Sequence, residues 1–299
     1  MDNKGLTITM IFKAQSLNYG EGIGNISELK KLSRGDGRVY TFASRQALRY
    51  DIARLGNKMY NWNLDVVDKS KGTIQFSDKY TIEDSQEMDL FGFMKTSKKA
   101  DGDTVTRSAP VRLSNAISLE DYKADMDFLN NKGLADRINE YPNLANVEQH
   151  FSYYTYTVTI DLEKVGKDGN IELSNEEKVK RVKQLLEIIK ILNREIRGRE
   201  ENLSPLFIIG GIYKINTPFF LGRINLQAKD SKFAISTKEL EDTMNLKVGN
   251  EEIEKNTSIG IIEGEFANEQ EIKETFSDKV KSIQQFFEDL EKQVEEYYM

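Results

Sequence analysis

The chain has 299 residues, of which 38% are hydrophobic, 10% aromatic and 30% charged, with a formal net charge of -7. This composition is typical of folded proteins, and no run of about 18 uncharged apolar residues predicts a membrane-spanning helix. The absence of cysteine excludes disulfides, thiolate nucleophiles and cysteine-based zinc sites, and the single histidine, His150, excludes a multi-histidine metal site.

The N-terminal segment predicts a strand, a glycine-rich loop and a helix. Residues 6–13 (LTITMIFK) are rich in β-branched and apolar side chains, which favours a buried first strand. Residues 18–25 (NYGEGIGN) carry three glycines at alternating positions, which permit unusual backbone dihedrals and a close approach by another group. Ser44 is a suitable N-cap for a helix whose apolar face is formed by Leu48, Ile52 and Leu55. Arg45 and Arg49, four residues apart, then lie together on another face.

The next segments predict short strands and a projecting hairpin. Between residues 62 and 84 we expect short strands or an irregular insertion, with a turn at 71–72. Residues 89–95 (DLFGFMK) lead into a polar, lysine-rich loop with a turn at 101–102. Order resumes over residues 109–119, so the intervening loop is expected to project from the fold.

The segment after this loop predicts helices on either side of a strand. Residues 120–150 are interpreted as short helices, and the alternation in residues 153–162 (YYTYTVTIDL) predicts a strand. Ser174 and Glu177 have the spacing of a capping box, which predicts a helix that ends near Gly198. Its apolar stripe would consist of Val179, Val182, Leu186, Ile189 and Ile196.

The remaining residues predict further strands and a final amphipathic helix. Residues 206–215 (LFIIGGIYKI) form a strong strand pattern, in which the glycine pair at 210–211 indicates a bulge or a close backbone approach. Further strands are expected before Ile235 and around residues 259–262. An acidic helix is expected over about 269–298. This order of elements predicts an α+β fold, with helices packed on a mainly antiparallel sheet.

The distribution of charge leaves room for a nucleic-acid surface despite the acidic total. Residues 1–60 hold 10 Lys and Arg against 5 Asp and Glu, whereas residues 239–299 hold 6 against 17. The two segments therefore carry net charges of +5 and -11. Because salt screens exposed charges over about 10 Å, a basic groove and an acidic surface can exist on one protein.

Two segments suit a phosphate backbone, each with an ordinary alternative. The loop at 18–25 matches neither a Walker loop nor the G-x-G-x-x-G fingerprint, so it is either a phosphate-facing loop or a surface turn. The helix opening at 44–49 (SRQALR) offers free N–H groups, an amide and two guanidiniums. Its arginines would otherwise pair with nearby acids on a solvated face. The lysine-rich loop with Lys95, Lys98 and Lys99 is open to the same two interpretations.

An aromatic cluster near residue 150 has two possible roles. His150, Tyr153, Tyr154 and Tyr156 would be able to stack on bases, a contact worth about 1–3 kcal/mol per base. Strand alternation instead turns at least some of these side chains into the core. Catalysis by His150 would require a partner that the sequence does not identify.

Several blocks, in this order, resemble one known family. They are residues 19–32 (YGEGIGNISELKKL), 44–50 (SRQALRY), 89–95 (DLFGFMK) with 107–119 (RSAPVRLSNAISL), and 151–162 (FSYYTYTVTIDL). Together, over at least residues 1–160, they look like the DevR-type backbone subunit of type I CRISPR Cascade and are most similar to the subtype I-B form.

The resemblance implies a fold and an assembly. It implies one RRM-like (ferredoxin-like) palm over residues 1–299 with inserted finger and thumb elements at about 56–88, 95–108 and 118–154. Copies of the subunit would polymerise along one guide RNA (crRNA). A cytoplasmic location is expected by default, because the N-terminal residues lack the basic-then-apolar pattern of a signal peptide. The further partners implied are the target DNA strand paired to the guide and other Cascade subunits, with no membrane, cofactor, metal or catalytic residue.

In the family, polar residues that open the helix after the first strand hold guide-RNA phosphates, and Ser44, Gln46 and Arg49 match them here. The full set of candidate RNA-binding residues is Asn18, Tyr19, Asn25, Lys30, Lys31, Ser44, Arg45, Gln46, Arg49, Lys95, Arg107, Arg112 and Asn115. Two alternatives remain open. One is a metal-dependent ribonuclease that uses Glu21 or Asp36, and the other is an autoregulatory DNA-binding protein, for which no helix-turn-helix signature is evident.

Overall fold

The palm of the fold is built from four strands and two helices. The computed structural model describes residues 4–70, 72–96 and 104–299. In chain order the palm elements are β1 (Gly5–Gln15), α1 (Arg45–Tyr60), β10 (Ala116–Ser118), β13 (Phe151–Asp161), α4 (Asn175–Lys190) and β18 (Phe207–Tyr213). In the sheet these strands lie in the order β18, β1, β13, β10. Since this is the ferredoxin-like arrangement, the predicted α+β fold with an RRM-like palm is confirmed.

The sheet extends beyond the palm at both edges. β23 (Ser258–Ile261) and β24 (Val280–Ser282) extend it beside β18, and β4 (Val39–Ala43) and β3 (Lys31–Ser33) extend it beside β10. β9 (Val111–Leu113) also pairs with β13. β1 pairs antiparallel with β13 along its whole length and with β18 on its other side, so β1 is the centre of the fold.

The glycine pair of β18 marks a close backbone approach. Gly210 and Gly211 pair in register with Ile8 and Thr7, so the ladder has no bulge at this point. A Cβ at Gly210 would lie 2.0 Å from the Thr7 carbonyl oxygen, and one at Gly211 would lie 1.8 Å from the Asn256 carbonyl oxygen. Of the two interpretations of this pair, close approach is therefore the right one.

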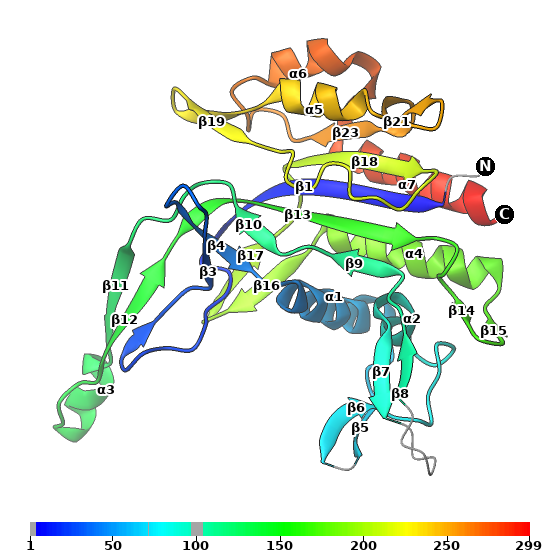
Figure 1. Cartoon of the computed structure of the whole chain (residues 1–299). Coiled ribbons are helices and arrows are strands. Elements are labelled where there is room, and N and C mark those ends of the chain that lie inside the picture. The colour runs from blue at the N-terminus through cyan, green and yellow to red at the C-terminus, as the bar shows by residue number, and fades with distance from the viewer. Residues whose placement is uncertain (1–3, 71, 97–103) are drawn as a thin grey trace.

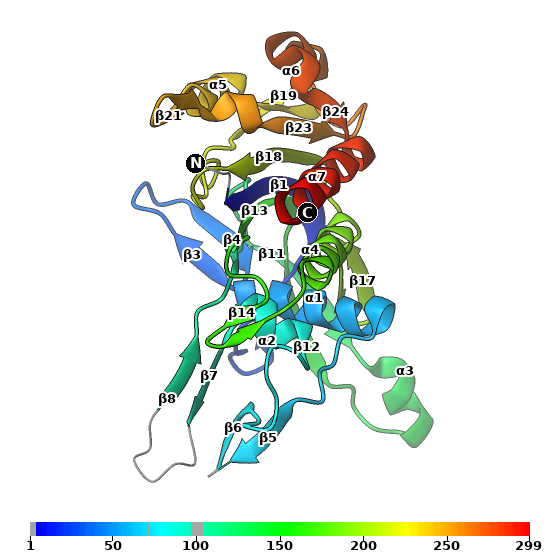
Figure 2. The same cartoon turned by 90° about the vertical axis from the view of Figure 1, so that its right-hand side faces the viewer.

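Two layers cover the two faces of the sheet (Figures 1 and 2). Alternate residues of β1, including Ile8 and Phe12, pack in a core with α1, α4 and α7 (Ile283–Tyr298). Ile11 faces the other side, where it shares a second core with Phe207 and with residues of α5 (Thr237–Met244) and α6 (Glu269–Phe276). Within the described residues, no helix is both long and apolar enough to cross a membrane.

Short hairpins complete the fold. They are β14 (Lys167–Asp168) with β15 (Ile171–Glu172), β16 (Asn193–Ile196) with β17 (Arg199–Asn202), β19 (Leu226–Lys229) with β20 (Lys232–Ile235), β21 (Lys247–Val248) with β22 (Glu251–Glu252), and β5 (Val67–Ser70) with β6 (Thr73–Phe76). The last of these confirms the short strands predicted between residues 62 and 84.

Two groups of elements project on the side of α1 (Figures 1 and 2). One comprises β5, β6, α2 (Gln86–Phe91) and the hairpin of β7 (Phe93–Thr96) and β8 (Thr104–Arg107), which confirms the predicted projecting hairpin. The other comprises β11 (Asp125–Asn130), α3 (Lys132–Ala135) and β12 (Leu144–Gln149), with β2 (Ile26–Ser27) beside β12. Lys71, Lys98, Lys99 and the turn at 101–102 lie outside the described residues. The division into one domain with three insertions stays a prediction.

The short helices predicted for residues 120–150 are mostly wrong. This segment is a hairpin of β11 and β12, and only its tip is helical, in α3 and a following 3-10 turn, Asp136–Ile138. Every residue of β11 is exposed. The strand therefore has no buried face to impose an alternating pattern on its sequence, and cross-strand hydrogen bonds alone define it.

The helix predicted over 269–298 is interrupted. α6 ends at Phe276, the following Ser277 has a φ of 45°, and Val280–Ser282 joins the sheet as β24 in parallel with β23. Ser282 then caps α7 by accepting a hydrogen bond from the Gln285 N–H at 3.2 Å. Apolar residues keep helical spacing across the break, so periodicity did not reveal it.

The helix capped by Ser174 begins as predicted but ends early. The Ser174 hydroxyl accepts a hydrogen bond from the Glu177 N–H at 3.3 Å, and α4 ends at Lys190 rather than near Gly198. Gly198 instead lies in the turn between β16 and β17, and Ile196 belongs to β16 rather than to the helix stripe.

Candidate nucleic-acid interface

The start of α1 brings together four of the predicted RNA-binding residues. The Ser44 side chain caps the helix by accepting a hydrogen bond from the Ala47 N–H at 3.3 Å, which confirms the predicted N-cap. Asn18 Nδ2 donates to Ser44 Oγ at 3.2 Å, and the Arg45 N–H donates to Asn115 Oδ1 at 2.9 Å. These bonds fix the glycine-rich loop and the β9–β10 connection against the positive end of the helix dipole.

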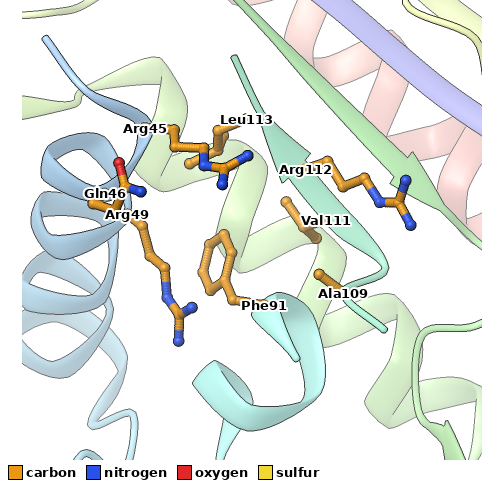
Figure 3. A pocket seen from close by; sticks show the side chains of 8 residues that line it. All are labelled: Arg45, Gln46, Arg49, Phe91, Ala109, Val111, Arg112 and Leu113. Carbon is orange, nitrogen blue, oxygen red and sulfur yellow. The ribbon is translucent and has the colours of Figure 1, made fainter. Parts of the chain in front are cut away.

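A pocket of about 450 Å³ opens beside this helix end. Figure 3 shows α1 on one side of it and β9 on the other, with the Phe91 ring between them. Its lining residues are Arg45, Gln46, Arg49, Phe91, Ala109, Val111, Arg112 and Leu113. A second hollow, of about 360 Å³, shares Arg45 and Gln46 and is also lined by Ser44 and Asn115. The two hollows share Arg45, Gln46 and Leu113, so they border one another, and together they are called the depression at the start of α1.

Two guanidiniums in this depression are free to bind an anion. Arg45 and Arg112 are exposed, and no carboxylate of the described residues pairs with either of them. Arg112 Nη2 donates to the Ser108 hydroxyl at 3.2 Å. Arg49 differs, because its Nη2 lies 2.8 Å from Glu87 Oε1 and its guanidinium lies over the Phe91 ring. Of the two arginines that were expected to bind phosphate or to pair with nearby acids, Arg49 therefore pairs with an acid and Arg45 does not.

Lys31 and Tyr19 are tied to Glu148 of β12. Lys31 Nζ lies 2.6 Å from Glu148 Oε1, and the Tyr19 hydroxyl donates to the Glu148 carbonyl at 3.1 Å. Burial alone would raise the pKa of Glu148, but the hydrogen bonds from Lys31 and the Leu29 N–H outweigh it and lower that pKa. The charge of Lys31 is thus neutralised within the protein. Lys30 is half-buried and Asn25 is exposed on the same loop.

Lys95 and Arg107 are buried and do not line the depression. Lys95 Nζ donates to the carbonyls of Ser77 and Tyr80, at 3.3 and 2.9 Å. Arg107 Nη2 lies 2.5 Å from a carboxylate oxygen of Asp89, whose side chain is fully buried. Both cations are bound by groups inside the protein, so they are not part of the proposed interface.

His150 and three tyrosines of β13 are packed in the protein interior. Tyr154 and Tyr156 are fully buried, and Tyr153 and His150 are only 6% and 7% exposed. Phe12 stacks on Tyr154 and meets Tyr156 edge to face. The prediction that these side chains pack in the core is confirmed. The alternative, in which they stack on bases, is wrong because they are buried.

His150 is expected to make stability depend on pH. Its Nδ1 lies 2.8 Å from the Thr41 hydroxyl, and burial lowers its pKa below the ordinary 6.5. As the pH falls below 6.5, the imidazole takes up a proton in the unfolded chain before it does so in the folded chain. The free energy of unfolding therefore decreases toward acid pH, and it is not reduced by His150 above the unfolded-state pKa. Urea unfolding at about pH 7.5 and about pH 5.5 should show a larger loss for the wild type than for His150→Gln. An equal loss in both proteins would contradict this role.

The early-loop acids do not form a metal site in the part of the chain that the structure describes. Glu21 is exposed, and Asp36 is exposed and 2.6 Å from the Arg38 guanidinium, whose hydrogen bond lowers the pKa of Asp36. Across residues 4–70, 72–96 and 104–299, no group of three or more His, Asp or Glu is placed to hold a metal ion.

Two residues of this region were not predicted from the sequence. Phe91 of α2 lines the pocket, and Arg197 places its guanidinium 4.1 Å from the centre of the Tyr19 ring. The sequence held no signal for Arg197, because it comes from a hairpin in the other half of the chain from Tyr19, a segment that was expected to be the end of a helix.

Solved structures share this fold. A chain of a "CRISPR RNA-guided surveillance complex, pre-nicking" has a TM-score of 0.57 and 10% identity, with 96% of this chain and 100% of that chain covered. A chain of a "CRISPR RNA-guided surveillance complex" has a TM-score of 0.53 and 12% identity, covering 95% and 99%. At such identities the likeness establishes the fold alone. No curated protein matches by sequence.

The sequence also matches the profile of a known family. The matched family is described as "CRISPR-associated negative auto-regulator DevR/Csa2", and the match covers residues 6–230. It therefore extends well past the last of the blocks on which the resemblance was based. The match spans most of the chain, and we conclude that the protein belongs to the DevR/Csa2 family of CRISPR-associated proteins.

Proposed function

We propose that this chain is a non-catalytic subunit that binds guide RNA and polymerises along it as the backbone of a type I CRISPR surveillance complex. Its partners would be the guide RNA, copies of itself, other Cascade subunits and the target DNA strand paired to the guide, in the cytoplasm. Membership of the DevR/Csa2 family and the fold shared with chains of surveillance complexes support this proposal.

The depression at the start of α1 carries the proposal. Arg45 and Arg112 reach it without a carboxylate partner among the described residues, and Gln46 adds an amide beside the N-terminal turn capped by Ser44. Guanidiniums, amides and helix N-termini are the groups that bind phosphate in proteins. Contacts to phosphates position a strand without reading its sequence, which a subunit that accepts any guide requires.

Replacing Arg45 and Arg112 together by glutamine is expected to weaken binding of single-stranded RNA for every sequence tested. A charged hydrogen bond contributes about 1.5–3 kcal/mol, so each arginine should account for about a tenfold change or more in Kd. Each lost phosphate contact should also make the dependence of log K on log salt shallower by about 0.7. Both quantities come from filter binding across a salt titration.

Lys238→Gln with Lys247→Gln is the matched control. These two exposed lysines lie on α5 and β21, in the layer on the opposite face of the sheet, and the double variant removes the same charge. If the arginine pair and the lysine pair gave the same affinity and the same salt slope, the interface at α1 would be wrong.

A further inference from the structure

The β16–β17 hairpin places a cation beside the glycine-rich loop. We propose that Arg197, at the tip of this hairpin, contacts a phosphate of the same single-stranded RNA that lies along α1, and that the Tyr19 ring holds its guanidinium in place. This inference rests on the proposed function. It extends the interface from the first helix to a segment of the C-terminal half of the chain.

The first strand of the hairpin is anchored to α1 and to the residues after β1. Arg194 Nε donates to the Leu17 carbonyl at 2.7 Å, and Arg194 Nη1 lies 2.6 Å from Asp51 Oδ2, a carboxylate that is 1% exposed. From the helix side, Arg54 Nη2 donates to the Asn193 carbonyl at 2.9 Å. These buried or half-buried bonds fix the hairpin against the helix whose N-terminus forms the proposed site.

The second strand is anchored to the end of β1. The Gln15 N–H donates to Glu201 Oε2 at 2.9 Å, and Arg199 Nη2 donates to the Gln15 carbonyl at 3.2 Å. Because both strands are held, the position of the tip is set by the fold rather than by the arginine at the tip. Figure 1 shows β16 and β17 beside α1.

The tip has a backbone geometry that arginine does not favour. Arg197 has a φ of 48° and Gly198 a φ of 76°, so both central residues of the two-residue turn are left-handed. Turns of this kind prefer Asn-Gly, and most other side chains lose stability in the left-handed region. Arginine at this position therefore needs a reason other than turn formation.

The side chain of Arg197 is placed to bind an anion. Its guanidinium lies 4.1 Å from the centre of the Tyr19 ring, and the Tyr19 hydroxyl is fixed by the Glu148 carbonyl. A planar guanidinium can stack on an aromatic ring while its N–H groups remain free at the edge. Arg197 is exposed, and among the residues the structure describes no carboxylate pairs with it.

The glycine-rich loop links this cation to the N-cap of α1. Tyr19 follows Asn18, which donates to Ser44 Oγ at the N-cap. Two consecutive residues of this loop, Asn18 and Tyr19, therefore contact the N-cap and the Arg197 guanidinium, which brings this cation near the end of the helix that lies beside the depression. Single-stranded RNA fits this surface because bonds to phosphates do not need a paired helix.

Arg197→Asn separates a role in RNA binding from a role in folding. Asparagine suits the turn, so Tm should stay unchanged or rise, whereas the affinity for a labelled single-stranded RNA of mixed sequence should fall about tenfold. The salt slope should become shallower by about 0.7, the loss of one phosphate contact. Arg197→Lys keeps the charge but not the stacked plane, so it should retain the slope and lose part of the affinity. Lys238→Asn is the control that removes one exposed charge from α5.

The outcomes distinguish this inference from the proposed function. Wild-type affinity and slope in Arg197→Asn, together with weakened binding in the Arg45 and Arg112 variant, would overturn the role of Arg197 and leave the proposed function standing. A lower Tm in Arg197→Asn with an unchanged slope would also overturn it, because the arginine would then serve the turn. No effect of either variant on RNA binding would overturn both.

Discussion

Replacing Asp89 by asparagine is expected to lower the free energy of unfolding by about 3–5 kcal/mol, because it leaves the buried Arg107 without a carboxylate partner and the buried Arg181 with Glu177 alone. The Asp89 carboxylate is fully buried. One oxygen accepts from Arg107 Nη2 at 2.5 Å and from the Gly166 N–H at 2.9 Å, and the other lies 3.0 Å from Arg181 Nη1. Arg107 and Arg181 are themselves 8% and 1% exposed, so water does not replace the lost charge.

Urea unfolding of Asp89→Asn measures this loss directly. Asp242→Asn on α5 is the matched control, since its carboxylate is exposed and its removal should change stability by less than about 0.5 kcal/mol. The carboxylate of Asp89 joins α2, β8 and α4, so the projecting elements should loosen before the palm unfolds. A loss below about 1 kcal/mol would show that the two guanidiniums find other partners.

Replacing Gly211 by alanine is expected to destabilise the protein by about 3 kcal/mol, at the upper end of the usual cost of overpacking. A Cβ at this position would lie 1.8 Å from the Asn256 carbonyl oxygen, and the atom in its way is backbone rather than a flexible side chain. Gly211 pairs with Thr7 in the central sheet, and Asn256 ends the 3-10 turn Ile253–Asn256 that leads into β23, so relieving the clash requires this turn to move away from the sheet.

Gly133→Ala is the control for this substitution. A Cβ at Gly133, in α3, would meet nothing within 4 Å, and the residue is helical, so alanine should leave stability unchanged or raise it slightly. Both variants are compared by urea unfolding. Equal stability of Gly211→Ala and Gly133→Ala would mean that the strand ladder shifts without cost.

The palm was predictable because its elements carry their own signals. The apolar run of β1 follows from burial of both faces of that strand, and the β-branched and aromatic residues of β13 follow from its place inside the sheet. The cap at Ser44 follows from the free N–H groups of the first turn of α1. The hairpin of β11 and β12 was missed because β11 buries neither of its faces, and the end of α6 was missed because the apolar spacing continues across Ser277.

The candidate site was predictable only where it is local. The residues that open α1 are adjacent in sequence, and the structure places Ser44, Arg45 and Gln46 around one depression. The sequence does not distinguish Lys95 and Arg107 from cations that are free to bind RNA. Only the fold shows that Lys95 binds the Tyr80 carbonyl and that Arg107 pairs with the Asp89 carboxylate. Arg197 could not be predicted from its neighbours in sequence, because its contact with Tyr19 forms only when the β16–β17 hairpin folds against the glycine-rich loop.

The layer of α5 and α6 covers one face of the palm sheet. In RNA-binding domains of this topology, aromatic side chains on the open sheet surface stack two or three bases. Here Phe207 on that surface is sealed beneath the second core, and Tyr153 is almost so. Because this surface is covered, the proposed RNA contacts lie at the start of α1 instead. Contacts to phosphates at that site would hold any strand, whatever its base sequence.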